Sequence, residues 1–373
     1  MGLNPRSLPD FPWDSLTPFR ERAAAHPGGV VDLSVGTPVD PTPEVVRAAL
    51  AAASDAPGYP TTQGTVALRQ AVVDWFSRTR GVHSLTADAV LPTVGSKELV
   101  AWLPALLGLG QGDVVVHPAA AYPTYDVGAR LAGATALATD DVASWAGRDD
   151  VRLVWINSPS NPTGRVLGRD ELREIVEAAR AIGAIVASDE CYAALAWEEP
   201  YASEGVPSVL DPAVCGGSHE GLLAVYSLSK QSNLAGYRAA FVAGDRALVG
   251  SLLETRKHAG MIVPAPVQAA TAAALGDDSH VAQQRERYRR RREALLPAVR
   301  DAGFSVPGSE AGLYLWATRG EDCWDTLAFL ADRGIVAAPG AFYGEQAREF
   351  VRIALTATDE RIEQAVHRLA KNG

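Results

Sequence analysis

A single lysine and an arginine eight residues further on stand out in the segment SLSKQSNLAGYRAAF, residues 227–241. The lysine, Lys230, comes just after the apolar run LLAVY (222–226), which is typical of a buried strand. Burying an ammonium group is costly unless the group is neutralised or paired. A lysine that is needed as a neutral amine is an exception, because desolvation favours that form and makes it a nucleophile. The segment therefore indicates a lysine with a chemical role.

Two other apolar runs also end in polar side chains. VRLVWIN is followed by SPSNPTG, which contains Asn161, and AIVAS is followed by Asp189 with Tyr192 three residues later. Taken singly, Asn161 could be a turn residue, Asp189 a helix cap and Lys230 a surface lysine. In open α/β sheets, however, ligands bind beyond the carboxyl ends of the strands. Three successive strand ends that carry an amide, an acid with a phenol, and an amine predict one site.

The elements that position these groups follow from apolar runs that alternate with amphipathic stretches. We predict strands at 114–117, 151–159, 184–190 and 222–229, with a helix over 168–183. Buried strands alternating with helices predict an α/β fold with a mostly parallel central sheet. A long helix over 279–303 begins a part of smaller strands and helices, typical of an α+β domain.

These patterns divide the chain into three parts. Residues 1–43 form an N-terminal arm and part of a small domain, residues 44–275 form the large domain, and residues 276–373 form the small C-terminal domain.

Composition excludes several functional classes. The formal net charge of −10 disfavours nucleic acid or an anionic membrane as a partner, and the basic cluster RERYRRRRE (285–293) is interpreted as a solvated helix face. Three widely spaced cysteines without a CxxC pair, and histidines without an HxxxH pair, predict neither a disulfide scaffold nor a metal site. The first residues lack the pattern of a signal peptide, so we expect a cytoplasmic protein.

SPSNPTG, SDECY and SLSKxxxxxGxR occur in the order in which they occur in the class I/II aminotransferases that depend on pyridoxal 5'-phosphate. GTPVDPTP, YPTTQGTVALRQAV, TVGSKE and VRIALT also resemble segments of that family, so the resemblance extends over nearly the whole chain. The resemblance implies the fold type I architecture and pyridoxal 5'-phosphate as cofactor.

The resemblance also implies catalytic roles. Lys230 is expected to bond covalently to the cofactor aldehyde and, once substrate has displaced it, to move the proton at the substrate Cα. Asp189 is expected to pair with the pyridine nitrogen, which keeps the ring an electron sink. Asn161 and Tyr192 are expected to donate to the phenolic oxygen, and Tyr122 to stack on the ring. Tyr125 is interpreted as a packing residue.

The resemblance also implies binding partners for the cofactor phosphate and for the substrate carboxylate. For the cofactor phosphate these are Gly95, Ser96, the backbone of Lys97, Ser227 and Arg238, because N–H groups at a helix start and a forked guanidinium suit a phosphate. Tyr59 is expected to reach the phosphate bound in a neighbouring subunit, which implies a homodimer. For the substrate α-carboxylate the expected partners are Arg352, Gly36 and Asn161.

Transamination is the expected reaction. The opening segment, GYPTTQGT and AYPTYDVGARLAGA resemble the actinobacterial succinyldiaminopimelate aminotransferases, which implies transfer between glutamate and N-succinyl-2-amino-6-oxopimelate in lysine and diaminopimelate biosynthesis. Aspartate, alanine or aromatic amino acids are alternative substrates, and a β-lyase is an alternative activity on the same fold.

Overall fold

The computed structural model describes residue 8 and residues 12–370. The strands are β1 (Val31–Asp32), β2 (Val90–Val94), β3 (Val114–His117), β4 (Thr135–Ala138), β5 (Val151–Asn157), β6 (Ile185–Asp189), β7 (Leu222–Ser227), β8 (Ala239–Gly244), β9 (Tyr314–Ala317), β10 (Ile335–Val336), β11 (Ala338–Pro339) and β12 (Val351–Ala354).

The α-helices are α1 (Thr17–Ala24), α2 (Glu44–Ala52), α3 (Val66–Arg80), α4 (Ser96–Leu106), α5 (Thr124–Ala132), α6 (Arg169–Ala181), α7 (Tyr201–Glu204), α8 (Pro212–Cys215), α9 (Leu228–Gln231), α10 (Arg246–Ala259), α11 (Ala265–Leu275), α12 (Asp278–Asp301), α13 (Cys323–Asp332) and α14 (Asp359–Ala370). Short 3-10 helices include η1 (Pro12–Leu16), η4 (Gly340–Tyr343) and η5 (Glu345–Ala347).

A central sheet organises the larger part of the molecule. In the described residues its strand order is β2-β8-β7-β6-β5-β3-β4. Strands β4, β3, β5, β6 and β7 run parallel, whereas β8 is antiparallel to both of its neighbours. The α/β class with a mostly parallel sheet is thus confirmed, and β8 is its one reversed strand among those described.

Two apolar clusters cover the two faces of this sheet, which is why its strands are apolar on both sides. Helices α3, α6 and α11 pack on one face, and α4, α5 and α10 pack on the other. The apolar cluster on the face covered by α4, α5 and α10 includes Tyr125, Trp155 and Val225. Helix and strand side chains therefore pack against each other near the strand ends.

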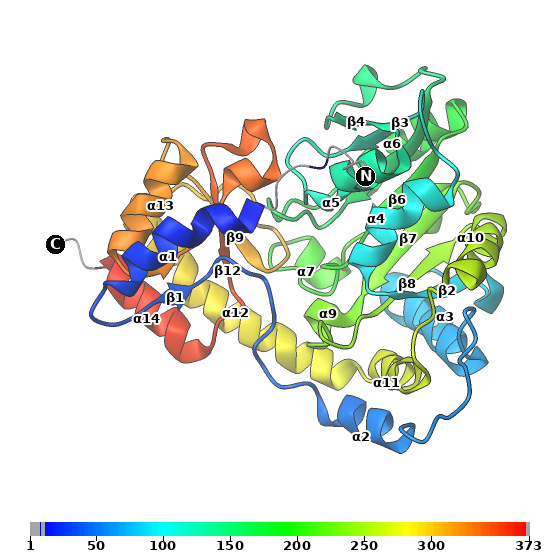
Figure 1. The fold of residues 1–373 in the computed structure, drawn as a ribbon, viewed down its shortest axis with the longest axis horizontal. Helices are drawn as coiled ribbons and strands as arrows, with labels where there is room; N and C mark the ends of the chain where they lie inside the picture. The colour runs from blue at the N-terminus through cyan, green and yellow to red at the C-terminus, as the bar shows by residue number, and fades with distance from the viewer. Residues whose placement is uncertain (1–7, 9–11, 371–373) are drawn as a thin grey trace, which may run out of the picture.

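The C-terminal part packs a small sheet, in the order β11-β12-β9, against α12, α13 and α14. Figure 1 shows this part beside the central sheet, with the long helix α12 running between them. Strand β1 pairs with β10, so the N-terminal segment is joined to the C-terminal part. The boundaries near residues 43 and 275 stay a prediction.

The basic cluster on α12 is only partly a solvated face. Arg289 is exposed and pairs with Glu286 and Glu293, as expected for a charged helix surface. In contrast, the Arg291 side chain is 4% exposed and bridges Asp40 and Asp359. That part of the prediction was wrong, because α12 uses its arginines to tie the N-terminal segment to α14.

None of the helices in the described residues combines the length and the apolar character needed to cross a bilayer.

Candidate active site

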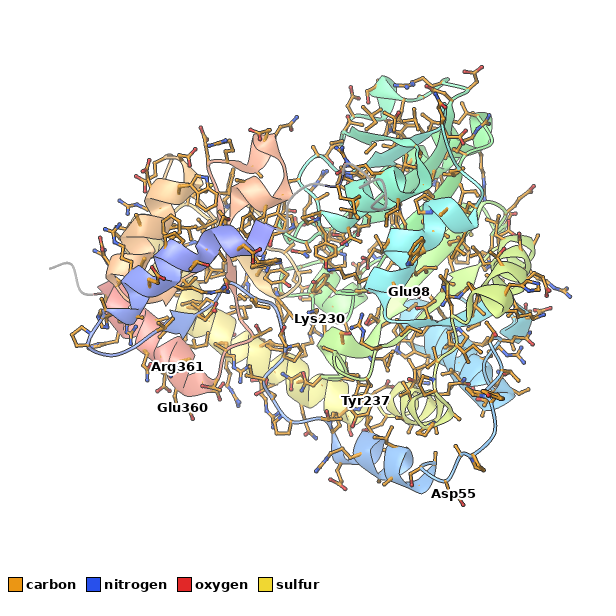
Figure 2. All side chains as sticks on the ribbon, in the orientation of Figure 1. Asp55, Glu98, Lys230, Tyr237, Glu360 and Arg361 are labelled. Carbon is orange, nitrogen blue, oxygen red and sulfur yellow. The ribbon has the colours of Figure 1, made fainter. Side chains whose placement is uncertain are left out.

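Three neighbouring strands deliver the predicted groups to one edge of the sheet. Asn157 at the end of β5 lies opposite Asp189 at the end of β6, and Asp189 lies opposite Val225 in β7. Strand β7 ends at Ser227, earlier than predicted, because the Ser227 hydroxyl accepts from the Ser229 N–H and starts helix α9. Lys230 therefore lies on a single helical turn, and Figure 2 shows it between the central sheet and the C-terminal part.

A cavity of about 330 Å³ opens at this edge. Most of the predicted site residues line it: Gly36, Ser96, Lys97, Tyr122, Asn161, Asp189, Tyr192, Ser227, Lys230, Arg238 and Arg352. Gly95 is outside the lining but adjoins it through Arg238. Tyr59 is fully exposed and does not reach the cavity of its own chain.

Asp189 lies at the floor of the cavity as a buried carboxyl group. Tyr125 donates its hydroxyl to Oδ2 at 3.0 Å, and the Cys191 N–H donates to Oδ1 at 3.2 Å. Burial raises the pKa of Asp189, while these hydrogen bonds and the charge on Lys230 oppose that rise. A buried carboxyl group of this kind is suited to a cationic partner such as a protonated ring nitrogen.

The start of helix α4 brings together groups suited to an anion with Ser227 at the end of β7 and Arg238 just before β8. Gly95 has φ +79°, and a Cβ there would lie 2.2 Å from Arg238 Nη2, so only glycine leaves room for the guanidinium. The Ser227 and Ser229 hydroxyls lie 2.8 Å apart in the same wall. Helix N–H groups, hydroxyls and a guanidinium are the donors that a phosphate dianion requires.

The Lys97 side chain also lies at the cavity. Its Nζ lies 5.6 Å from the centre of the Tyr122 ring, and both residues line the cavity. The chain thus places a cation beside the aromatic wall.

Arg352 forms the other end of the cavity. Its Nη2 donates to the Ser34 carbonyl at 2.7 Å, and its Nη1 donates to Asn161 Oδ1 at 2.8 Å. Within the described residues its Nε has no hydrogen-bond partner, although the side chain is buried. A buried guanidinium that lines a cavity and has N–H groups beyond the two used in these hydrogen bonds is suited to bind a carboxylate.

Lys230 lies between these two ends. Its Nζ donates to the carbonyl of Gly36. A Cβ on Gly36 would lie 1.9 Å from the Tyr314 hydroxyl oxygen, so the lack of a side chain lets this backbone approach both groups. The amine, the acid and the guanidinium therefore face one cavity.

Several cavity residues were missed by the sequence analysis. Tyr125, interpreted as a packing residue, also holds Asp189, and Tyr314 contacts both Tyr192 and Arg352. Asn157 accepts from the Asn161 N–H at 2.7 Å and so shapes the turn that carries Asn161. Its place at the last residue of a strand was a usable signal. Trp13, Cys191 and Ser229 also line the cavity.

Comparison with known proteins gives this fold and site a family. The model of the aminotransferase class I and II family matches residues 28–369. The chain is 61% identical over 364 residues to "Probable aminotransferase Rv1178" of Mycobacterium tuberculosis, covering 97% of this chain and 85% of that protein. It is 59% identical to "4-dedimethylamino-4-oxo-anhydrotetracycline transaminase OxyQ" of Streptomyces rimosus, covering 98% and 99%. The chain belongs to the class I and II aminotransferases, which depend on pyridoxal 5'-phosphate.

Solved structures agree with this assignment. An aminotransferase from Neisseria meningitidis has a TM-score of 0.85 at 31% identity, covering 97% of this chain and 96% of that one. The N-succinyldiaminopimelate aminotransferase from Mycobacterium tuberculosis has a TM-score of 0.84 at 25% identity, covering 96% of both chains. The expected family, fold type and cofactor are therefore confirmed.

The residues present fit this cofactor. Asp189 would supply a buried anion for the ring nitrogen, the start of α4 with Arg238 would hold the phosphate, and Lys230 would supply the amine. When bound, pyridoxal 5'-phosphate supplies an aldehyde and an electron sink for the electrons released at the substrate Cα.

Proposed function

We propose that this protein transfers an amino group between glutamate and an oxo acid, with Lys230 as the residue that carries the proton. The observation that carries the proposal is one cavity that holds an amine, a buried carboxyl group and a buried arginine with unpaired N–H groups. Both an amino acid and an oxo acid present an α-carboxylate, so one arginine can serve both half-reactions.

Each side chain then has a task. Arg352 and Asn161 orient the α-carboxylate, which fixes the Cα–H bond relative to the Lys230 amine. Lys230 would take the proton from the substrate Cα and return it at C4′, the aldehyde-derived carbon of the cofactor, which lies across the substrate nitrogen from Cα. Asp189 keeps the ring nitrogen protonated, and Tyr192 with Asn161 holds the phenolic oxygen.

For the acceptor we propose N-succinyl-2-amino-6-oxopimelate, in the route to diaminopimelate and lysine. Two relationships support it: the structural likeness to the M. tuberculosis N-succinyldiaminopimelate aminotransferase, and curated relatives described as LL-diaminopimelate aminotransferases, one of them 32% identical. Such an acceptor carries carboxylates beyond the one bound at Arg352. Lys97, which has no carboxylate partner among the described ion pairs, is the cavity cation that can receive one.

A second acceptor class has its own support. The relative that is 59% identical over nearly both full lengths is described as a transaminase of an oxo-anhydrotetracycline, so its acceptor is a ring ketone. The aromatic side chains of Trp13, Tyr122 and Tyr314 line the cavity and offer flat apolar surface for a ring.

The test is a pair of half-reactions followed by absorbance. Glutamate added to the holoenzyme should remove the visible band of the lysine-bound cofactor, and an acceptor should restore it. Faster recovery of the visible band with the succinylated oxo acid than with oxaloacetate, pyruvate or phenylpyruvate supports the proposed acceptor. Faster recovery with a ring ketone than with any of these four oxo acids favours the second acceptor class. A band that glutamate leaves unchanged, with release of an oxo acid and ammonia from a β-substituted amino acid, contradicts transamination and favours a β-lyase.

We also propose a homodimer in which Tyr59 reaches the phosphate bound in the other subunit. Tyr59 is fully exposed here, and Val66 and Val39 along the same segment are exposed by 69% and 52%. Exposed apolar side chains in one stretch support an interface. Sedimentation of the holoenzyme as a monomer, or a Tyr59→Phe variant with unchanged cofactor affinity, would contradict this arrangement.

A further inference from the structure

The helical turn that carries Lys230 is too short to hold its own shape. Helix α9 contains four residues, Leu228–Gln231. A single turn is not stable alone, because ordering its backbone costs more than its few hydrogen bonds return. The Ser227 hydroxyl, which accepts from the Ser229 N–H, fixes the first end of the turn. Contacts from elsewhere in the molecule must therefore fix the second end, which directly follows Lys230.

A buried histidine on α12 reaches this second end. The helix α12 contacts α9, as Figure 1 shows near the N-terminal end of α12. His280 Nε2 lies 2.8 Å from the hydroxyl oxygen of Ser232, the residue that ends the turn, and His280 Nδ1 lies 3.0 Å from Asp277 Oδ2. Because His280 and Ser232 are both buried, loss of either side chain leaves the other polar group unpaired.

These contacts belong to a chain of hydrogen bonds that runs in one direction. The Tyr226 hydroxyl donates to Gln231 Oε1 at 2.6 Å, and Gln231 Nε2 donates to the Ser232 hydroxyl at 3.3 Å. The Asp277 carboxylate only accepts, so His280 Nδ1 donates to it, and Nε2 of the neutral imidazole accepts from Ser232. Each link thus joins one donor to one acceptor, and the chain spans the turn from strand β7 to helix α12.

A glutamine one turn further along α12 holds the next residue of the loop. Gln284 Oε1 accepts from Asn233 Nδ2 at 2.9 Å, and Gln284 Nε2 donates to Asp40 Oδ2 at 2.8 Å. Asn233 has φ +56°, a conformation that asparagine adopts more readily than most residues. Asp40 belongs to the same segment as Gly36, whose carbonyl accepts from Lys230. Gln284 therefore joins the loop after Lys230 to the segment that Lys230 contacts.

We propose that His280 and Gln284 are positioning residues that hold the Lys230 amine toward the cofactor site. Their contacts fix Ser232 and Asn233, so Lys230 Nζ is oriented before the cofactor aldehyde arrives. The amine then forms its C=N bond to the aldehyde carbon, with loss of water, and the turn need not be ordered at that step. The inference rests on the role proposed above for Lys230, and it adds α12, a helix of the C-terminal part, to the elements that support that role.

The test compares two forms of the cofactor. Pyridoxal 5'-phosphate bonds to Lys230, whereas pyridoxamine 5'-phosphate has the same ring nitrogen and phosphate but no aldehyde, so it needs no amine from the protein. The ratio of their dissociation constants, from absorbance and tryptophan-fluorescence titrations of the full-length protein freed of cofactor, therefore reports on the Lys230 amine. In His280→Leu and in Ser232→Ala the ratio should shift about fivefold against the aldehyde form, the factor that one neutral hydrogen bond contributes.

His280→Gln is the conservative variant. Its amide retains an acceptor for the Ser232 hydroxyl and a donor for Asp277, so the ratio should return to that of wild type. The double variant His280→Leu/Ser232→Ala should show the same ratio as either single variant, because both changes remove one link. Gln284→Met changes the neighbouring contact independently and should shift the ratio in the same direction.

Arg285→Met is the matched control. Arg285 also lies on α12 and donates to the carbonyls of Ala196 and Ala202, so this variant loses two hydrogen bonds of the same helix. Neither bond involves the residues that follow Lys230. The melting temperature should therefore fall, whereas the ratio of the two dissociation constants should equal that of wild type.

The outcomes separate the inference from the proposed function. A wild-type ratio in both Ser232→Ala and Gln284→Met overturns the inference, as does a shift of the same size in Arg285→Met. A His280→Gln variant that behaves as His280→Leu, or a double variant whose shift is the product of the two single shifts, overturns it as well. Because these titrations use no amino acid, a wild-type holoenzyme whose visible band does not respond to glutamate overturns the proposed function instead.

Discussion

Replacing Arg352 with lysine keeps the positive charge at the proposed carboxylate site and removes the planar geometry of the guanidinium. Of the five N–H groups of the guanidinium, one goes to the Ser34 carbonyl and one to Asn161 Oδ1. Three remain, including the unpartnered Nε, so a carboxylate can be held by two parallel bonds. An ammonium has three N–H groups on one atom, and satisfying the same two buried acceptors leaves one for the substrate.

The expected loss is therefore one charge-assisted hydrogen bond. Such a bond contributes about 1.5–3 kcal/mol, so kcat/KM should fall by about 10- to 150-fold for glutamate and for each oxo acid. The assay is the single-turnover rate at which substrate changes the cofactor absorbance. Cofactor affinity should be unchanged, because Arg352 lies at the opposite end of the cavity from the phosphate cradle.

Two comparisons make this prediction refutable. A primary amine without a carboxylate should react equally fast with wild type and Arg352→Lys, because it has no group that binds to Arg352. Arg256→Lys changes another fully buried arginine, paired with Glu98 at 2.9 Å outside the cavity lining, and should leave the ratio between glutamate and the amine unchanged. If the amine slows as much as glutamate does in Arg352→Lys, the arginine supports the fold and the reasoning is wrong.

Three further changes test other parts of the site and fold. Asp189→Asn should abolish most turnover. Because burial raises the pKa of Asp189 in the folded protein, the ionised carboxylate destabilises the cofactor-free protein above that pKa. The melting temperature of the variant should therefore exceed that of wild type above that pKa, and the difference should shrink as pH falls through it. Gly95→Ala should weaken cofactor binding measured by absorbance titration, whereas Gly81→Ala, with a similar φ of +66° and open space around it, should lower only stability. Asp277→Ala removes the cap of α12 and should lower Tm by about 1 °C at pH 7. Hydrogen bonds from Ser279 and His280 lower the pKa of Asp277 to about 2, so this difference should vanish as pH falls toward that value.

The groups at strand ends were predictable because the rule that places them is local. Asn161, Asp189 and Lys230 each follow an apolar run, and parallel strands bring their carboxyl ends to one edge. The rule gave no direction for strand β8, which is antiparallel, since an apolar run carries no sign of direction. Arg352 was found only through resemblance, because it reaches the cavity from a different sheet.

Tyr314 and Tyr125 were missed for a related reason. Each belongs to a mostly apolar stretch, AGLYLWA and AYPTYDVGA, in which a tyrosine is typical of the core. Both rings are indeed buried, and only the partner of the hydroxyl marks them as part of the site. That partner lies 64 residues away for Tyr125 and 122 for Tyr314, so no window of sequence contains it.

Asn157 was not predicted as a site residue, and its contribution to the free energy of unfolding follows from its hydrogen bonds. Its Nδ2 donates to the carbonyls of Pro159 and Asp189, and its Oδ1 accepts from the Asn161 N–H. The Asp189 carbonyl also accepts from the Ser158 N–H, so Asn157→Ala leaves two buried groups unpaired, the Pro159 carbonyl and the Asn161 N–H, at about 1 kcal/mol each at the least. With the usual entropy of unfolding per residue, about 2 kcal/mol corresponds to a fall in Tm of about 3 °C.

The same variant should act on substrate binding, since the turn that carries Asn161 loses its anchor. KM for glutamate should rise more than KM for the primary amine, because only glutamate uses Asn161 to orient a carboxylate. Thr93→Val is the matched control, because the Thr93 hydroxyl is buried without a partner in the described residues and its removal breaks no hydrogen bond. A melting temperature of Asn157→Ala equal to that of Thr93→Val would mean that solvent or a shifted backbone satisfies the two groups, and that the strand end does not depend on this amide.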